Sequence, residues 1–108
     1  ENLIERTELN RADLSQSDGM EVIVARFVIK PGGYLPLHVH HGDEHVIVVE
    51  GGSLVTDDGK AIEFPTGLAM NFPREQVHGG FTVTGDAPLV VHTVHIVDKG
   101  KPLMVMVD

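Results

Sequence analysis

The sequence predicts a small all-β domain closed into a barrel or jelly roll, from the distribution of its apolar residues. These residues occur in short runs bounded by glycine, proline or aspartate, and no run repeats with the 3.6-residue period of a helix. The 12 glycines and 6 prolines supply turns between the runs. Short apolar strands with open edges tend to aggregate, so a closed sheet is the favoured arrangement.

The expected strands follow one another at short intervals along the chain. They cover residues 20–30, 44–50, 53–57, 60–64, 67–72, 78–84, 89–97 and 102–107. The sequence Pro31-Gly32-Gly33 ends the first strand, and the pair Asp58-Gly59 is typical of a tight hairpin. The one helical turn that we expect lies near residues 10–15.

A chain of 108 residues has room for one domain, residues 1–108, with a single core. We divide it into an N-terminal arm over residues 1–19, a barrel core over 20–97 and a C-terminal strand over 98–108. The arm is more polar and is expected to lie against the barrel or a partner. Residues 102–107 are apolar on both faces, which the edge of a monomer would not leave exposed, so we predict a homodimer.

The charge of the chain argues against two classes of partner. Sixteen acidic residues against eight lysines and arginines give a net charge of −8, which repels nucleic-acid phosphates and anionic lipid headgroups. No apolar stretch approaches the roughly 20 residues that a membrane helix needs. The absence of cysteine excludes disulfides, thiolate zinc sites and cysteine nucleophiles. The compartment stays open between the cytoplasm and a periplasmic or exported location.

Histidines are concentrated in one short segment, where they predict a metal site. His38 and His40 are separated by one residue, so on a strand they point to the same side, about 6–7 Å apart along the chain. Glu44 lies just beyond the intervening loop, at the start of the next apolar strand, and His78 opens a later strand. The alternative interpretation is a loop of solvated histidines that binds no metal.

These residues resemble the two motifs of the cupin superfamily, in particular its small single-domain, quercetin dioxygenase-like members. The first motif, G-x5-H-x-H-x3/4-E-x6-G, is matched throughout by Gly32, His38, His40, Glu44 and Gly51. The second, G-x5-P-x-G-x2-H-x3-N, is matched by Gly67, Pro73 and His78, with Glu75 in place of glycine and Thr82 in place of asparagine. The resemblance implies a double-stranded β-helix with the metal ligands His38, His40, Glu44 and His78 facing into the barrel.

Three imidazoles and a carboxylate suit one divalent transition metal per chain. Iron, manganese, nickel, copper, cobalt and zinc all accept such a set, and the sequence does not choose among them. Four protein ligands leave two positions of an octahedral ion open to substrate, O₂ or water.

The resemblance implies a dioxygenase-like oxidoreductase that acts on a small apolar or aromatic molecule. Glu44 would then be both a ligand and a candidate catalytic proton acceptor. Val46, Val48, Phe72 and Phe81 are the expected dry wall of the substrate pocket.

Two alternatives stay open, and the sequence does not decide whether the chain is an enzyme. One is a module that binds a small ligand or metal without turnover. The other is a metal-dependent lyase or isomerase. Lyases of this superfamily carry a tyrosine two residues after the glutamate, where this chain has Val46, and sugar isomerases would need more lysine and arginine.

The remaining histidines are expected to lie outside the ligand set. His41 and His45 have the opposite strand parity to the neighbouring ligands and should point outward. His92 and His95 are three residues apart and should lie on opposite faces of a late strand. One of them could line the barrel as a base beside the metal, but a hydrogen-bonded core or surface role is favoured for both.

Overall fold

The computed structural model describes residues 2–107, and over that range it consists of strands and their connections. The strands are β1 (Ile4–Asp13), β2 (Met20–Ile29), β3 (Tyr34–Leu35), β4 (His38–Val39), β5 (Gly42–Glu50), β6 (Gly52–Thr56), β7 (Ala61–Phe64), β8 (Ala69–Phe72), β9 (Phe81–Thr84), β10 (Leu89–Asp98) and β11 (Val105–Met106). Within residues 2–107, no helix has the length and apolarity needed to cross a bilayer. The two ends of the predicted domain, residues 1 and 108, lie outside the described residues.

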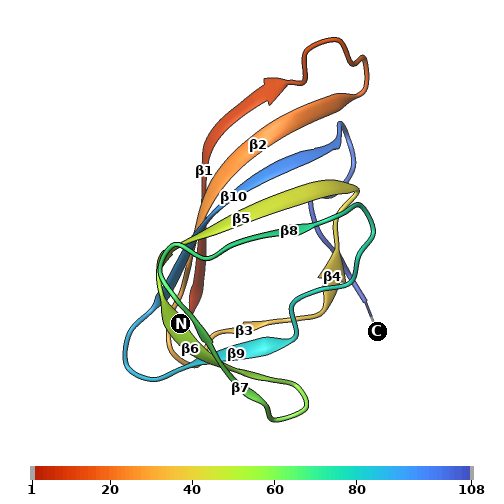
Figure 1. Ribbon diagram of the computed structural model, residues 1–108. Coiled ribbons are helices and arrows are strands. Elements are labelled where there is room, and N and C mark those ends of the chain that lie inside the picture. Colours follow the sequence, from red (N-terminus) through yellow and green to blue (C-terminus); the bar gives the residue numbers. More distant parts are fainter. Residues whose placement is uncertain (1, 108) are drawn as a thin grey trace.

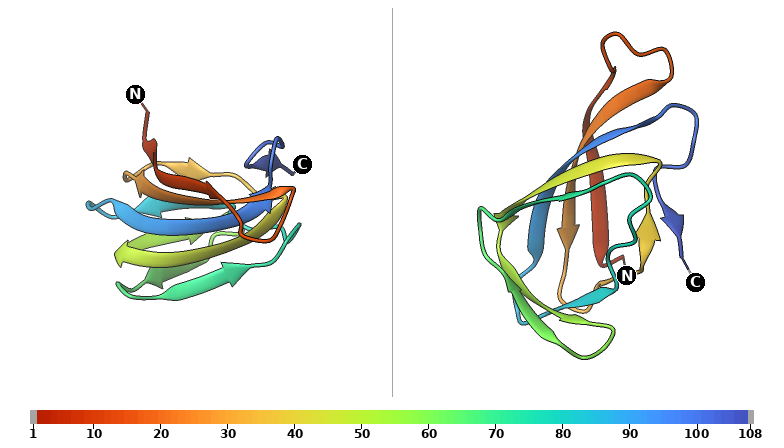
Figure 2. Two further views of the ribbon diagram at one scale, coloured as in Figure 1. Left: turned by 90° about the horizontal axis from the view of Figure 1, so that it is seen from above. Right: turned by 45° about the vertical axis from the view of Figure 1, so that its right-hand side comes forward.

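Two antiparallel sheets form the barrel, as the sequence predicted. One has five strands in the order β1-β2-β10-β5-β8, and the other has four in the order β3-β9-β6-β7. Figures 1 and 2 show them facing each other, with the short ladder of β4 and β11 at one side. Strands that are distant in sequence are neighbours in space, which is the arrangement of a jelly roll.

The alternation of side chains along β5 and β10 determines what faces the interior. On β5, Glu44, Val46 and Val48 are buried while the residues between them face outward. On β10, every second residue from Val91 to Val97 is buried. The two strands are antiparallel neighbours, so the inward residues of one strand lie beside those of the other.

An apolar core joins the two sheets. Its buried members are Ile29, Val46, Val48, Leu54, Val83, Leu89 and Val91. Full burial of such side chains stabilises the fold by roughly 1.5–3 kcal/mol each. The core therefore holds the sheets together from their inner faces, and the clustered histidines lie outside it at one end of the barrel.

Two local predictions are wrong in the same way. The expected helical turn near residues 10–15 is strand as far as Asp13, because β1 pairs with β2 along its whole length and this ladder outweighs the local preference. The expected strand over residues 102–107 is reduced to Val105–Met106, which pairs with β4 of the same chain. In both cases a long-range partner decided the conformation.

Candidate metal centre

Four side chains from separate segments meet at one end of the barrel. His38 lies on β4, His40 follows β4 directly, and Glu44 lies on β5. His78 is brought to them by a backbone bridge with His38. One ligand atom from each residue can be chosen so that all of these atoms lie within 4.8 Å of one another. The structure thus brings together the four residues that the sequence predicted as ligands.

Each of the three imidazoles is oriented by a hydrogen bond to the backbone. The Nδ1 atoms of His38, His40 and His78 lie 2.7, 2.7 and 2.9 Å from the carbonyl oxygens of Pro36, Leu103 and Gln76. A carbonyl oxygen can only accept, so each Nδ1 carries the proton and donates it. The Nε2 atom of each ring therefore keeps a free lone pair, which is the form in which histidine binds a metal.

The Nε2 lone pairs of His40 and His78 converge on the carboxylate of Glu44. Its Oε1 lies 2.9 Å from Nε2 of His78 and 3.1 Å from Nε2 of His40. Despite that short distance, Nε2 of His40 is buried and has no hydrogen bond of acceptable geometry among the described residues. A lone pair that is buried, unpaired and directed at a carboxylate fits a site built for a cation.

The electrostatics of the cluster also fit a cation. Burial alone would raise the pKa of Glu44, but its close contacts with the rings of His40 and His78 lower it to about 2, so the carboxylate is ionised at neutral pH. Burial lowers the pKa of His38 and favours the neutral ring that a metal needs. At His40, burial is outweighed by Glu44 and the carbonyl of Leu103, and the pKa is raised.

Gly79 allows His38 and His78 to approach each other. Its φ angle is +92°, and a Cβ at this position would lie 2.5 Å from the carbonyl oxygen of Pro36 and 3.0 Å from Nδ1 of His38. Any side chain would therefore disturb the hydrogen bond that orients His38. Both the turn and the geometry of the site therefore require glycine at this position.

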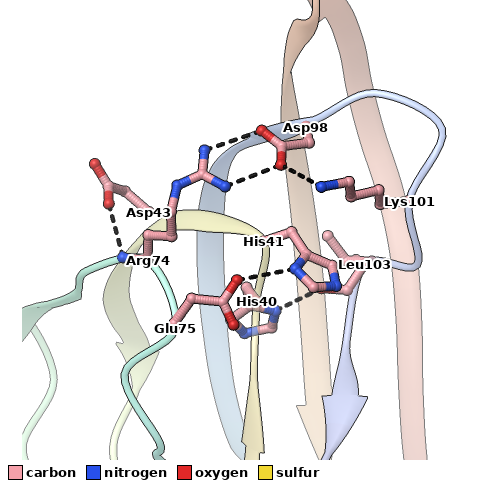
Figure 3. Close-up of polar contacts among 8 residues, drawn as sticks. All are labelled: His40, His41, Asp43, Arg74, Glu75, Asp98, Lys101 and Leu103. Carbon is pink, nitrogen blue, oxygen red and sulfur yellow. Dashed lines mark hydrogen bonds and ion pairs between the residues drawn. The ribbon is translucent and has the colours of Figure 1, made fainter.

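A network of polar contacts holds the loop that carries Glu75 beside His40 (Figure 3). Arg74 forms two hydrogen bonds of 2.9 Å with the carboxylate of Asp98, and the backbone nitrogen of Glu75 donates to the carbonyl oxygen of His40. Glu75 has a φ of 64°, and it stands where the cupin motif has glycine. The turn that the motif requires is therefore retained, although an ordinary side chain must adopt the left-handed conformation.

A cavity of about 360 Å³ opens beside the four ligands. Its wall is mainly aliphatic and aromatic, and includes Phe27, Leu54, Phe64, Met70, Phe72 and Phe81. The predicted wall is confirmed for Val46, Phe72 and Phe81, whereas Val48 packs in the core instead. Phe72 stacks on His78 with the ring centroids 4.1 Å apart, so a residue of the cavity wall also holds this candidate metal ligand in place.

Comparison with known proteins assigns the family. The model of the cupin domain matches residues 25–97, which is more than half of the chain. The chain is a cupin. The sequence resemblance to the superfamily is thereby confirmed, together with the double-stranded β-helix that it implied.

Solved structures share the fold of this cupin at low identity. The polyketide cyclase RemF from Streptomyces resistomycificus is 23% identical with a TM-score of 0.67, over 98% of this chain and 73% of that one. A double-stranded β-helix protein from Klebsiella pneumoniae is 17% identical with a TM-score of 0.66, over 97% and 84% of the two chains.

The DMSP lyase DddQ from Ruegeria pomeroyi is 17% identical with a TM-score of 0.62, over 95% of this chain and 51% of that one. Likeness at these identities establishes the shared fold alone. No curated protein matches the cupin by sequence.

His95 also lies at this site, a position that the sequence favoured less than a hydrogen-bonded core or surface role. It is 0% exposed, its Nε2 lies 3.7 Å from Oε2 of Glu44, and its ring centroid lies 4.8 Å from that of His40. Within residues 2–107 neither ring nitrogen has a hydrogen-bond partner, and His95 lies where the less favoured prediction, a histidine beside the metal, would put it. Strand parity with Val91 and Val97 would have placed His95 on the buried face, but only the register with β5 puts it opposite Glu44.

The other histidines of the cupin lie outside the cluster. His45 is exposed on the outer face of β5, as predicted. His41 is only partly buried, and its Nδ1 lies 3.0 Å from Glu75 at the rim of the site. His92 lies on the opposite face of β10 from His95, where its Nε2 contacts Arg26 at 3.0 Å.

Proposed function

We propose that this cupin is a metal-dependent enzyme, a dioxygenase-like oxidoreductase that acts on a small apolar or aromatic molecule. One observation carries the proposal: three oriented imidazoles and an ionised carboxylate stand at the edge of a cavity whose remaining wall is almost wholly apolar. The ligands favour one divalent transition metal per chain. The cavity favours a substrate whose carbon skeleton is buried while one polar end faces the ligands.

The chain's own residues bind and orient such a substrate. Aromatic and aliphatic side chains exclude water and bury the carbon skeleton, which stabilises binding by roughly 25 cal/mol per Å² of apolar surface. Thr93 also lines the wall, but its Oγ1 is buried and adds no accessible polar group to the cavity.

A divalent transition metal held by His38, His40, Glu44 and His78 supplies Lewis acidity and, when it is redox-active, reactivity toward O₂. A carboxylate whose pKa is near 2 is a poor proton acceptor at neutral pH. We therefore propose that Glu44 acts foremost as a ligand. Its service as a base would require the loss of its contacts with His40 and His78.

Oxygen uptake tests the proposal. Protein loaded with Fe(II) without air should be mixed with catechols, flavonols and β-diketones, and then exposed to oxygen in an electrode cell. We expect at least one compound to be consumed in proportion to the oxygen, and His38→Ala to abolish the uptake. His45→Ala is the matched control, because that histidine is exposed on the outer face of β5. Absence of uptake across the panel, with iron bound, would refute the oxygenase proposal.

A redox-neutral reaction on a carbonyl-containing substrate is the second candidate. The apolar cavity supports it, as does the likeness to the polyketide cyclase RemF over 98% of this chain. This candidate predicts turnover of a carbonyl compound under nitrogen by the zinc-loaded protein. Tight ligand binding without turnover in air or nitrogen would instead identify a binding module.

A further inference from the structure

We propose that His95 is a positioning residue: it donates a hydrogen bond to Oε2 of Glu44 and so keeps Oε1 directed at the imidazoles of His40 and His78. This inference rests on the metal site of the proposed function and not on the nature of the reaction. It assigns a role to a residue that stands outside the cupin motifs.

The two oxygens of Glu44 have different neighbours. Oε1 is the atom that faces His40 and His78, at 3.1 and 2.9 Å. Oε2 faces away from them, toward Nε2 of His95 at 3.7 Å. That separation is about half an ångström beyond the upper end of a normal N–H···O hydrogen bond, so the proposed contact requires a rotation of one of the two side chains. The carboxylate thus presents one oxygen to the cluster and the other to His95.

The fold fixes His95 behind Glu44. Residues 44 and 95 are directly opposed in the antiparallel ladder of β5 and β10. Side chains of such pairs start about 4.5–5.5 Å apart and point to the same face. His95 does not belong to the group of residues whose ligand atoms all lie within 4.8 Å of one another. It therefore acts through Glu44 and is not itself a ligand.

The burial of His95 has no explanation in stability. The ring is 0% exposed, and both nitrogens lack a partner within residues 2–107. An unsatisfied buried polar group costs about 1–3 kcal/mol, and an apolar side chain of similar size would avoid that cost. A neutral imidazole has one N–H to donate and does not repel a bound cation. These properties suit a donor that fixes a metal ligand.

Two substitutions of similar size separate positioning from packing. His95→Gln retains an N–H donor, whereas His95→Met fills the same space without one. His92→Gln is the matched control, since that histidine lies on the same strand but faces Arg26 on the other side. For each protein we would measure Co(II) affinity by competition with a chromophoric chelator, the visible spectrum of the Co(II) form, and the melting temperature of the metal-free form.

We expect His95→Met to weaken Co(II) binding roughly 10–100-fold and to change the visible spectrum, as loss of a residue that orients a ligand does. Its metal-free form should melt at about the same temperature as wild type, because removal of the unsatisfied Nδ1 offsets the loss of the hydrogen bond to Glu44. His95→Gln should recover most of the affinity. His92→Gln should leave both affinity and spectrum unchanged.

Co(II) affinity equal to that of the wild type, with an unchanged spectrum, in both His95 variants would overturn the inference. Parallel losses of affinity and of metal-free stability in both variants would also overturn it, because they would indicate packing. If His95→Met does not fold, His95→Leu takes its place in the comparison. Failure of the wild-type protein to bind Co(II) is a different result, which would remove the metal site itself and with it the proposed function.

Discussion

Each of the three candidate metal-binding histidines uses one ring nitrogen for the protein and keeps the other for the site. The Nδ1 atoms donate to backbone carbonyls, so the rings cannot rotate without breaking a hydrogen bond of 2.7–2.9 Å. This fixes the orientation of the lone pairs before any metal arrives, which reduces the conformational cost of binding.

Loss of a single ligand is expected to empty the site. His38→Ala and His78→Ala each remove one Nε2 from the cluster, so each variant should lose most of its metal. Wild-type protein should carry close to one transition ion per chain, measured by elemental analysis after extensive dialysis. His45→Ala should keep the full amount, since that side chain is exposed. Full occupancy in both ligand variants would show that the assignment of the site is wrong.

Acid is expected to release the metal. A metal binds only neutral imidazole, so protons compete with it increasingly as the pH falls below about 6.5. The pKa of His40 is raised because Glu44 and the Leu103 carbonyl outweigh burial, so competition there begins at a higher pH than at His38, where burial lowers the pKa. A bound metal stabilises the fold by an amount that grows with the logarithm of its affinity, and this stabilisation should therefore shrink from about pH 7 to pH 5.

The measurement is the difference in melting temperature between metal-loaded and metal-free protein across that range. We expect the two curves to approach each other as the pH falls. Curves that stay parallel would mean that protons do not compete for the ligands.

At the scale of the strands, long-range pairing limited what could be predicted. The ranges expected at 20–30 and 89–97 agree closely with Met20–Ile29 and Leu89–Asp98, because their apolar composition is sufficient. The polar strand β1 was missed, since its conformation depends on pairing with β2. The four ligands could be predicted from motif spacing, whereas the position of His95 required the register between β5 and β10, which local sequence does not encode.

The turn before β9 is expected to tolerate no side chain at Gly79. Gly79→Ala meets both an unfavourable φ of +92° and the backbone oxygen of Pro36. Gly59→Ala is the matched control, because its φ is +86° but no atom lies within 4 Å of the added Cβ. The control should cost about 1–2 kcal/mol of unfolding free energy, the usual cost of left-handed backbone for alanine.

Gly79→Ala should cost clearly more than the control and should also lower metal affinity, because His38 is displaced. Urea unfolding of the metal-free proteins measures the first effect, and titration with Co(II) measures the second. Equal unfolding free energies for the two variants would show that the close approach at Gly79 is unimportant.

The whole molecule is predicted to form a twofold dimer. Although β11 pairs with β4 of its own chain, Met106 is 52% exposed and other apolar side chains beside it, Leu37 and Val107, are also exposed. Light scattering at micromolar concentration should report the mass of two chains. Met106→Lys should shift the mass toward one chain without loss of metal, since its side chain lies outside the cluster. The mass of one chain for the wild type would refute the prediction.

The hydrogen bonds that orient His40 and His78 end on the carbonyls of Leu103 and Gln76, and every amino acid has a carbonyl. Residues 76 and 103 can therefore be substituted without a change in the orientation of the imidazoles, provided that the backbone keeps the same path. The cavity wall is made of side chains, and each change there alters what fits. Descendants of this barrel could thus acquire new substrates while they inherit one unaltered metal centre. In a saturation-mutagenesis library, most substitutions at positions 76 and 103 should leave metal binding unchanged, whereas substitutions in the cavity wall should change which ligands bind.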